Sequence, residues 1–100
     1  MTDMAFMKLT NDLTALGDTE QAVAKKLEEL DCKGTHDSLD CPIANYLKRL
    51  GYEDIDVCPD DVFASKDNMP LGIETPLPVS NFITTFDDGG YPSLYKKMEP

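Results

Sequence analysis

The amino-acid sequence predicts an α+β fold: three amino-terminal helices, a small antiparallel β-hairpin or three-stranded sheet, then one or two carboxyl-terminal helices. Apolar residues recur at helical spacing within residues 6–16, 23–30, 43–50 and 79–86, whereas they alternate with polar residues within 55–74. Leu-Gly pairs end two of the helical segments, because glycine tolerates the backbone that follows a helix. A chain of 100 residues has the size of one domain, residues 1–100.

Two helices are predicted before residue 31. The first covers residues 3–16, where four apolar residues share one face. The second covers residues 19–30 with Asp18 as its N-cap, because a carboxylate there accepts hydrogen bonds from the free amide groups of the first turn. The apolar residues predicted to face the core from this second helix are Val23, Leu27 and Leu30.

A third helix is predicted to begin at Asp40 or Cys41. Pro42 suits the first turn of that helix, because backbone amide groups there have no helical partner and proline has no amide hydrogen. Two or three short strands follow, separated by the turn segments 59–61 and 66–68. After two prolines, a fourth helix runs to residues 87–90, and one more turn follows it. The predicted buried side chains of the third and fourth helices are Ile43, Tyr46, Leu47, Leu50, Val79, Phe82, Ile83 and Phe86.

The net charge of −10 is concentrated in the second half of the chain. Residues 50–95 hold nine acidic residues and one basic residue, Lys66, whereas residues 1–49 hold nine acidic and six basic residues. Such a surface repels phosphate backbones and attracts basic molecules. We therefore expect no direct binding to nucleic acid, and the expected partner is a basic protein.

The sequence also predicts a cytoplasmic protein without membrane contact. No apolar run approaches the roughly 18 residues that a membrane helix needs, and the first ten residues lack the charge order of a secretory signal. The three cysteines are an odd number without a C-x-x-C pair, which indicates reduced thiols.

The candidate binding residues are the acidic side chains of the predicted hairpin and of the end of the fourth helix. They are either a solvated surface or a contact surface in which carboxylates stand in for phosphates. No calcium-loop pattern is present among them. These residues are Glu53, Asp54, Asp56, Asp60, Asp61, Asp67, Asp87 and Asp88.

Cys41 and His36 form the alternative candidate site, that of a thiol-dependent enzyme. A cysteine at a helix N-terminus gains thiolate character, and His36 is the only histidine that could serve as its base. The neighbouring carboxylate of Asp40 opposes ionisation of the thiol. A zinc site formed with Cys32 and Cys58 has ligands of suitable type but lacks paired short spacings, so no metal and no cofactor are expected.

The segments CPIANYL (41–47) and FDDGGYPSL (86–94) together resemble a family of short uncharacterised proteins, mainly actinobacterial, with relatives in phages. Its motifs are C-P-x-A-x-Y-L and F-D-x-G-x-Y-P-x-L, and the resemblance covers about residues 9–95. It implies the same order of helices and strands and no particular reaction. We expect a non-enzymatic, acidic protein-binding factor, a bacterial or phage accessory protein that blocks a basic, nucleic-acid-binding partner. The sequence leaves the oligomeric state open.

Overall fold

The computed structural model describes residues 3–95. The predicted α+β class is confirmed, because three helices precede a three-stranded antiparallel sheet and a fourth helix and a short 3₁₀ turn follow it. None of the helices within this part of the chain is both long enough and apolar enough to cross a bilayer. The elements are α1 (Asp3–Thr14), α2 (Glu20–Glu29), α3 (Pro42–Arg49), β1 (Glu53–Val57), β2 (Asp61–Lys66), β3 (Met69–Glu74), α4 (Leu77–Asp87) and η1 (Pro92–Leu94).

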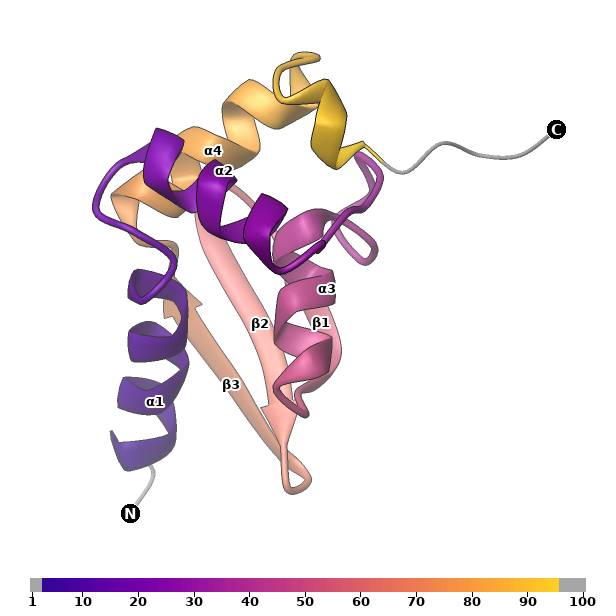
Figure 1. The fold of residues 1–100 in the computed structure, drawn as a ribbon. Helices are drawn as coiled ribbons and strands as arrows, with labels where there is room; N and C mark the ends of the chain where they lie inside the picture. Colours follow the sequence, from indigo (N-terminus) through magenta and orange to yellow (C-terminus); the bar gives the residue numbers. More distant parts are fainter. Residues whose placement is uncertain (1–2, 96–100) are drawn as a thin grey trace, which may run out of the picture.

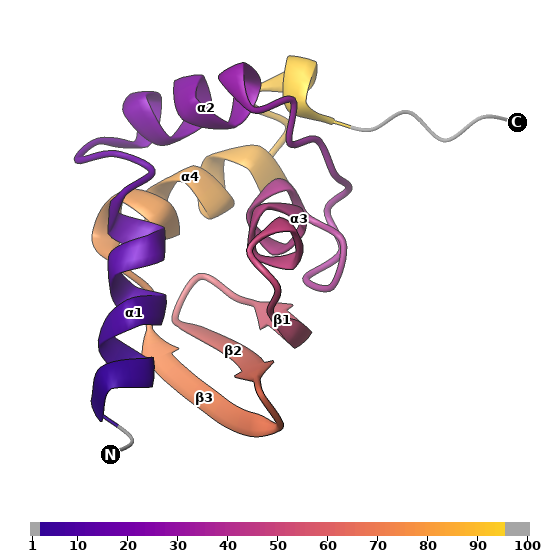
Figure 2. The ribbon, with the colours of Figure 1, turned by 60° about the horizontal axis from the view of Figure 1, so that its bottom comes forward.

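The helices are arranged on one side of the sheet (Figure 1). Along the sheet, α1 contacts β3 and α3 contacts β1, while α2 lies over α4 and η1. Figure 2 shows the strands at the bottom of the view with the helices above and beside them. Within residues 3–95, no helix covers the other side of the sheet, which is left to solvent.

The strands lie in the order β1-β2-β3, and their side chains alternate between the two sides of the sheet. On the helix side, Val62 and Ala64 are buried, whereas Phe63 between them is half-exposed. A two-residue turn, Asp67 and Asn68, joins β2 to β3 with positive φ at both positions (54° and 66°). Such a turn matches the twist of the strands and fixes which residues pair across them.

Side chains cap the starts of α2 and α3. Asp18 is not the N-cap of α2; Thr19 is, and its hydroxyl oxygen accepts a hydrogen bond from the Ala22 amide at 3.1 Å. The predicted start of the third helix is confirmed, with Cys41 as N-cap and Pro42 in the first turn. Threonine and aspartate both suit an N-cap, so their adjacent positions left the start of α2 ambiguous by one residue.

The prediction that Leu30 and Leu50 face the core is wrong, because these residues are 39% and 37% exposed. Both are C-cap residues, at which the chain leaves the helix. Their side chains therefore no longer follow the apolar face of the helix that lies against the core. Their carbonyl groups are used instead: Arg49 donates to Leu30, and Lys66 donates to Leu50 at 3.0 Å. Basic groups at these helix ends also complement the helix dipole. Likewise, α1 ends at Thr14 instead of residue 16.

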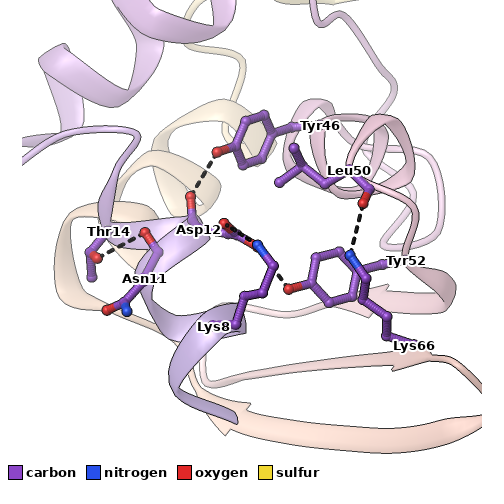
Figure 3. Close-up of polar contacts among 8 residues, drawn as sticks. All are labelled: Lys8, Asn11, Asp12, Thr14, Tyr46, Leu50, Tyr52 and Lys66. Atoms are coloured by element: carbon purple, nitrogen blue, oxygen red, sulfur yellow. Dashed lines mark hydrogen bonds and ion pairs between the residues drawn. The ribbon is translucent and has the colours of Figure 1, made fainter. Parts of the chain in front are cut away.

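Asp12 fastens α1 to α3 and to the start of the sheet (Figure 3). The Tyr52 hydroxyl donates to Asp12 Oδ2 at 2.7 Å, and the Tyr46 hydroxyl donates to the Asp12 carbonyl oxygen at 2.8 Å. Lys8 lies 3.3 Å from the same carboxylate. Since these residues are up to 40 positions apart in the chain, the cluster contributes to tertiary stability and not to a single helix.

Replacing Tyr52 with phenylalanine is expected to lower the free energy of unfolding by about 1.5–3 kcal/mol, because a hydrogen bond to a charged carboxylate is lost while the ring remains. Urea denaturation followed by circular dichroism measures this loss. Tyr95→Phe is the control, since the Tyr95 hydroxyl bonds to no residue within 3–95, and it should change stability by less than about 0.5 kcal/mol. Equal losses in the two variants would contradict the role of the Asp12 contact.

Stability should also depend on the ionisation of Tyr52 at alkaline pH. Burial, followed by the hydrogen bond to Asp12, raises the pKa of Tyr52 above its ordinary value. The contribution is therefore complete below about pH 10, where the unfolded side chain ionises, and is lost as the pH rises further. We expect the free energy of unfolding to fall less steeply above about pH 10 in Tyr52→Phe than in the wild type. Denaturation curves across that range measure the slope.

Candidate interaction surface

The solvent side of the sheet gathers acidic side chains around one aromatic ring. Strand pairing puts Asp56 opposite Phe63 and Phe63 opposite Gly72. The next pair of β2 and β3 on the same side of the sheet is Asp61 with Glu74. Glu53 is paired with Ser65 on the same side of the sheet. We call this surface the outer sheet face, formed by Glu53, Asp56, Asp61, Phe63, Gly72 and Glu74.

Within residues 3–95, the outer sheet face carries no basic side chain. Lys66 is the only basic residue of the three strands. It is two positions after Ala64 on β2, so its side chain points to the same side of the sheet, the side of the helices. There its Nζ donates to the Leu50 carbonyl oxygen and lies 4.7 Å from the centre of the Tyr52 ring, as Figure 3 shows. The register of the sheet thus separates the strand cation from the carboxylates.

A backbone irregularity keeps the carboxylates of β1 on this face. The pairing shifts by one residue between Glu53 and Asp56, and Asp54 has a positive φ of 49°. This bulge absorbs one residue, so Glu53 and Asp56 both point to solvent although they are three positions apart. Without it, one of them would point toward the helices.

Sequence reasoning missed Phe63 and Glu74 as members of this surface. Phe63 is 49% exposed, and Glu74 is exposed at the end of β3. The periodicity of the sequence does not assign their partners, because strand pairing is not a local property. The Asp67-Asn68 turn is the signal that could have found them, since it sets Lys66 opposite Met69 and hence Phe63 opposite Gly72.

The other predicted acidic residues lie away from the outer sheet face. Asp54 lies at the bulge, Asp60 in the turn between β1 and β2, and Asp67 in the turn at the opposite end of the hairpin. Of the eight predicted binding residues, three therefore belong to the outer sheet face. The structure brings Glu53, Asp56 and Asp61 together and adds Glu74 to them.

Asp87 and Asp88 lie at the carboxyl end of α4, where they border an open hollow of about 450 Å³ together with Pro59. Burial raises the pKa of the Asp87 carboxyl, while the charge of His36 opposes that shift. Two carboxylates at this end of a helix are unfavourable, since its dipole is negative there and the last turn has no basic residue. This second acidic group lies beside the turn between β1 and β2, which contains Pro59.

The thiol of Cys58 lies next to the outer sheet face. Its Sγ is 3.6 Å from Asp56 Oδ1, and the residue is half-buried, whereas Cys32 and Cys41 are 0% and 5% exposed. Burial, followed by the charge of Asp56 and a hydrogen bond to it, raises the pKa of this thiol. Cys58 is thus the accessible cysteine among the three but a weakly ionised one.

Cys41 is placed as a structural N-cap. Its Sγ accepts a hydrogen bond from the Ala44 amide at 3.4 Å, and burial raises its pKa to about 11 in spite of this and other backbone bonds. The helix N-terminus therefore does not produce a reactive thiolate, because the loss of hydration outweighs the favourable amide groups.

His36 is exposed and packs against two aromatic rings, at 4.9 Å from the Phe86 ring centre and 4.8 Å from that of Tyr95. In the described part of the chain, no hydrogen bond joins it to Cys41. The geometry gives the Cys41–His36 alternative no nucleophile and base in contact. Over residues 3–95, no three histidine, cysteine, aspartate or glutamate side chains are placed to hold one metal ion.

The two segments that carry the family resemblance both contribute to the core. CPIANYL forms the start of α3, and FDDGGYPSL forms the end of α4 and η1, whose Leu94 is fully buried. Comparison of the chain with protein-family models, curated proteins and solved structures finds no match. The resemblance stays a prediction, and function has to be inferred from the surface itself.

Alkylation of the native protein at about pH 8 should modify Cys58 first and Cys41 far more slowly, since at a pKa near 11 only about one Cys41 thiol in a thousand is ionised. Asp56→Asn should speed the modification of Cys58 by about two- to fivefold, because a nearby negative charge is removed. Mass spectrometry of the labelled peptides measures each rate.

Asp67→Asn is the control for that experiment, because Asp67 lies in the turn at the far end of the hairpin and should leave the Cys58 rate unchanged. Preferential labelling of Cys41 would contradict the structural role of its thiol and would favour the thiol-enzyme alternative.

Proposed function

We propose that this protein is a non-enzymatic, acidic binding factor that uses its outer sheet face to hold a basic protein. The observation that carries the proposal is a one-sided sheet whose solvent side combines four carboxylates with a half-exposed phenylalanine and, within residues 3–95, no cation. A surface with an aromatic centre and a charged surround has the anatomy of a protein contact.

Charge favours a basic partner over the other classes. The net charge of −10 repels nucleic acid directly and speeds encounter with positively charged surfaces at low ionic strength. Exposed pairs of opposite charge contribute only about 0.2–1 kcal/mol each, so several must act together with apolar contact. The outer sheet face offers both.

The partner we propose is a nucleic-acid-binding protein whose basic groove the sheet blocks. On β1, Glu53 and Asp56 lie opposite Ser65 and Phe63, and on β2 and β3 Asp61 is paired with Glu74. Outward positions of one strand are about 7 Å apart and neighbouring strands about 5 Å apart, so the four carboxylates present spaced negative charge to a groove that otherwise holds phosphates. In this proposal the chain is a cytoplasmic bacterial or phage accessory protein, in keeping with the family that it resembles.

A comparison of three immobilised baits tests the proposal: the wild type, Asp56→Asn with Glu74→Gln, and Asp18→Asn with Glu29→Gln. The last pair removes the same charge from two exposed positions, one just before α2 and one at its end. Figure 2 shows α2 at the opposite end of the view from the strands. At about 50 mM salt, the wild type and the Asp18→Asn, Glu29→Gln variant should retain the same basic proteins from bacterial lysate. The Asp56→Asn, Glu74→Gln variant should retain less of them.

Loss of the two charges of the sheet should weaken the purified partner's affinity by about two- to thirtyfold, from about 0.2–1 kcal/mol for each exposed charge pair. The wild type should also displace a DNA oligonucleotide from that partner. Equal capture by all three baits, or binding that is insensitive to salt, would contradict the proposal.

A further inference from the structure

We infer that the outer sheet face recognises an arginine side chain of its partner, with the guanidinium group stacked on the Phe63 ring and hydrogen-bonded to Asp56 or to the Asp61 and Glu74 pair. This inference rests on the proposed function and names the group that the surface selects. It is carried by the placement of one ring and of the carboxylates next to it.

Phe63 is held in place by the residue opposite to it. A Cβ atom added at Gly72 would lie 3.0 Å from both Cδ1 and Cε1 of Phe63, so the ring leans across β3 into the space that a side chain would fill. Glycine at this position lets the aromatic ring cover the neighbouring backbone. The ring is therefore fixed against the sheet while the residue remains 49% exposed.

The Phe63 ring has no aromatic or cationic partner within residues 3–95. His36, Phe82, Phe86, Tyr91 and Tyr95 make the aromatic contacts of the helix side, and Lys66 is stacked on Tyr52 there. Phe63 takes part in none of these. An exposed aromatic ring surrounded by negative charge is a favourable place for a cation, because the face of the ring is itself electronegative.

Carboxylates lie within reach of a cation on that ring. Asp56 is the direct neighbour of Phe63 on β1, at a position where side chains of paired strands are about 5 Å apart. Asp61 and Glu74 form the next pair, two residues along each strand. A guanidinium group can stack on a ring and at the same time donate two parallel hydrogen bonds to a carboxylate, which the ammonium group of lysine cannot do.

Other occupants fit this surface less well. A second copy of the chain would bring carboxylates against carboxylates, and like charges that face one another are destabilising. An apolar peptide would cover Phe63 but would desolvate the four carboxylates without providing them with hydrogen-bond donors. A basic partner that presents arginine satisfies both the ring and the acids.

The test titrates the protein with two blocked peptides of equal length and charge, (Gly-Arg)₄ and (Gly-Lys)₄, and follows amide and Phe63 ring signals by NMR. The arginine peptide should bind about three- to tenfold more tightly than the lysine peptide. Phe63→Leu keeps an apolar side chain without an aromatic ring and should abolish that preference while weak binding of both peptides remains. Asp56→Asn should weaken both peptides, and Asp18→Asn neither.

Unchanged amide spectra away from β2 show that Phe63→Leu folds. Equal affinity for the two peptides, or a preference for arginine that survives Phe63→Leu, overturns the inference and leaves the proposed function standing. Absence of binding by both peptides overturns it as well, and the comparison of baits then decides the proposed function separately. Self-association at the peptide concentrations used, in place of peptide binding, would assign this face to a second copy.

Discussion

The pairing register of β2 and β3 is the constraint on which the surface of this protein depends. Strand side chains alternate, so a slip of one residue would exchange the two sides of the sheet. Val62 and Ala64 would then be exposed, and Phe63 and Lys66 would change places with respect to the helices. The positive φ values of Asp67 and Asn68 hold the register at the turn, and the burial of the valine and alanine side chains opposes any slip along the strand.

The helices use the other side of the same sheet, and their contacts remove positive charge from the solvent side. Lys66 is bound to the end of α3 and stacked on Tyr52, and Arg49 is bound to the end of α2. These bonds serve helix ends that would otherwise have free carbonyl groups. The acidity of the outer sheet face is therefore a result of where the cations are needed for folding as well as of composition.

The order of helices and strands could be predicted from the sequence because it depends on local periodicity and on turn residues. Phe82 and Phe86 are buried as their spacing indicated, and Cys41 begins α3. The surface could be predicted only in part, because membership of a face depends on strand pairing and on the bulge at Asp54, which are not local properties. Asp87 shares only its charge with the acidic residues of the hairpin, since it lies at the end of α4 beside Pro59. For Cys41, burial raises the pKa of the thiol, and the position of the residue at a helix N-terminus does not reveal how deeply it is buried.

The position of Cys58 gives this surface a chemical handle of its own. A maleimide fluorophore or a photoreactive crosslinker attached there would be held next to Asp56, which is paired with the aromatic residue that we propose as the contact. The two remaining thiols are enclosed in the core, so the native sequence directs such a reagent to one site without engineered cysteines. A photoreactive group on Cys58 therefore allows a molecule bound to the outer sheet face to be captured covalently in a crude mixture and identified by mass spectrometry of the crosslinked peptide.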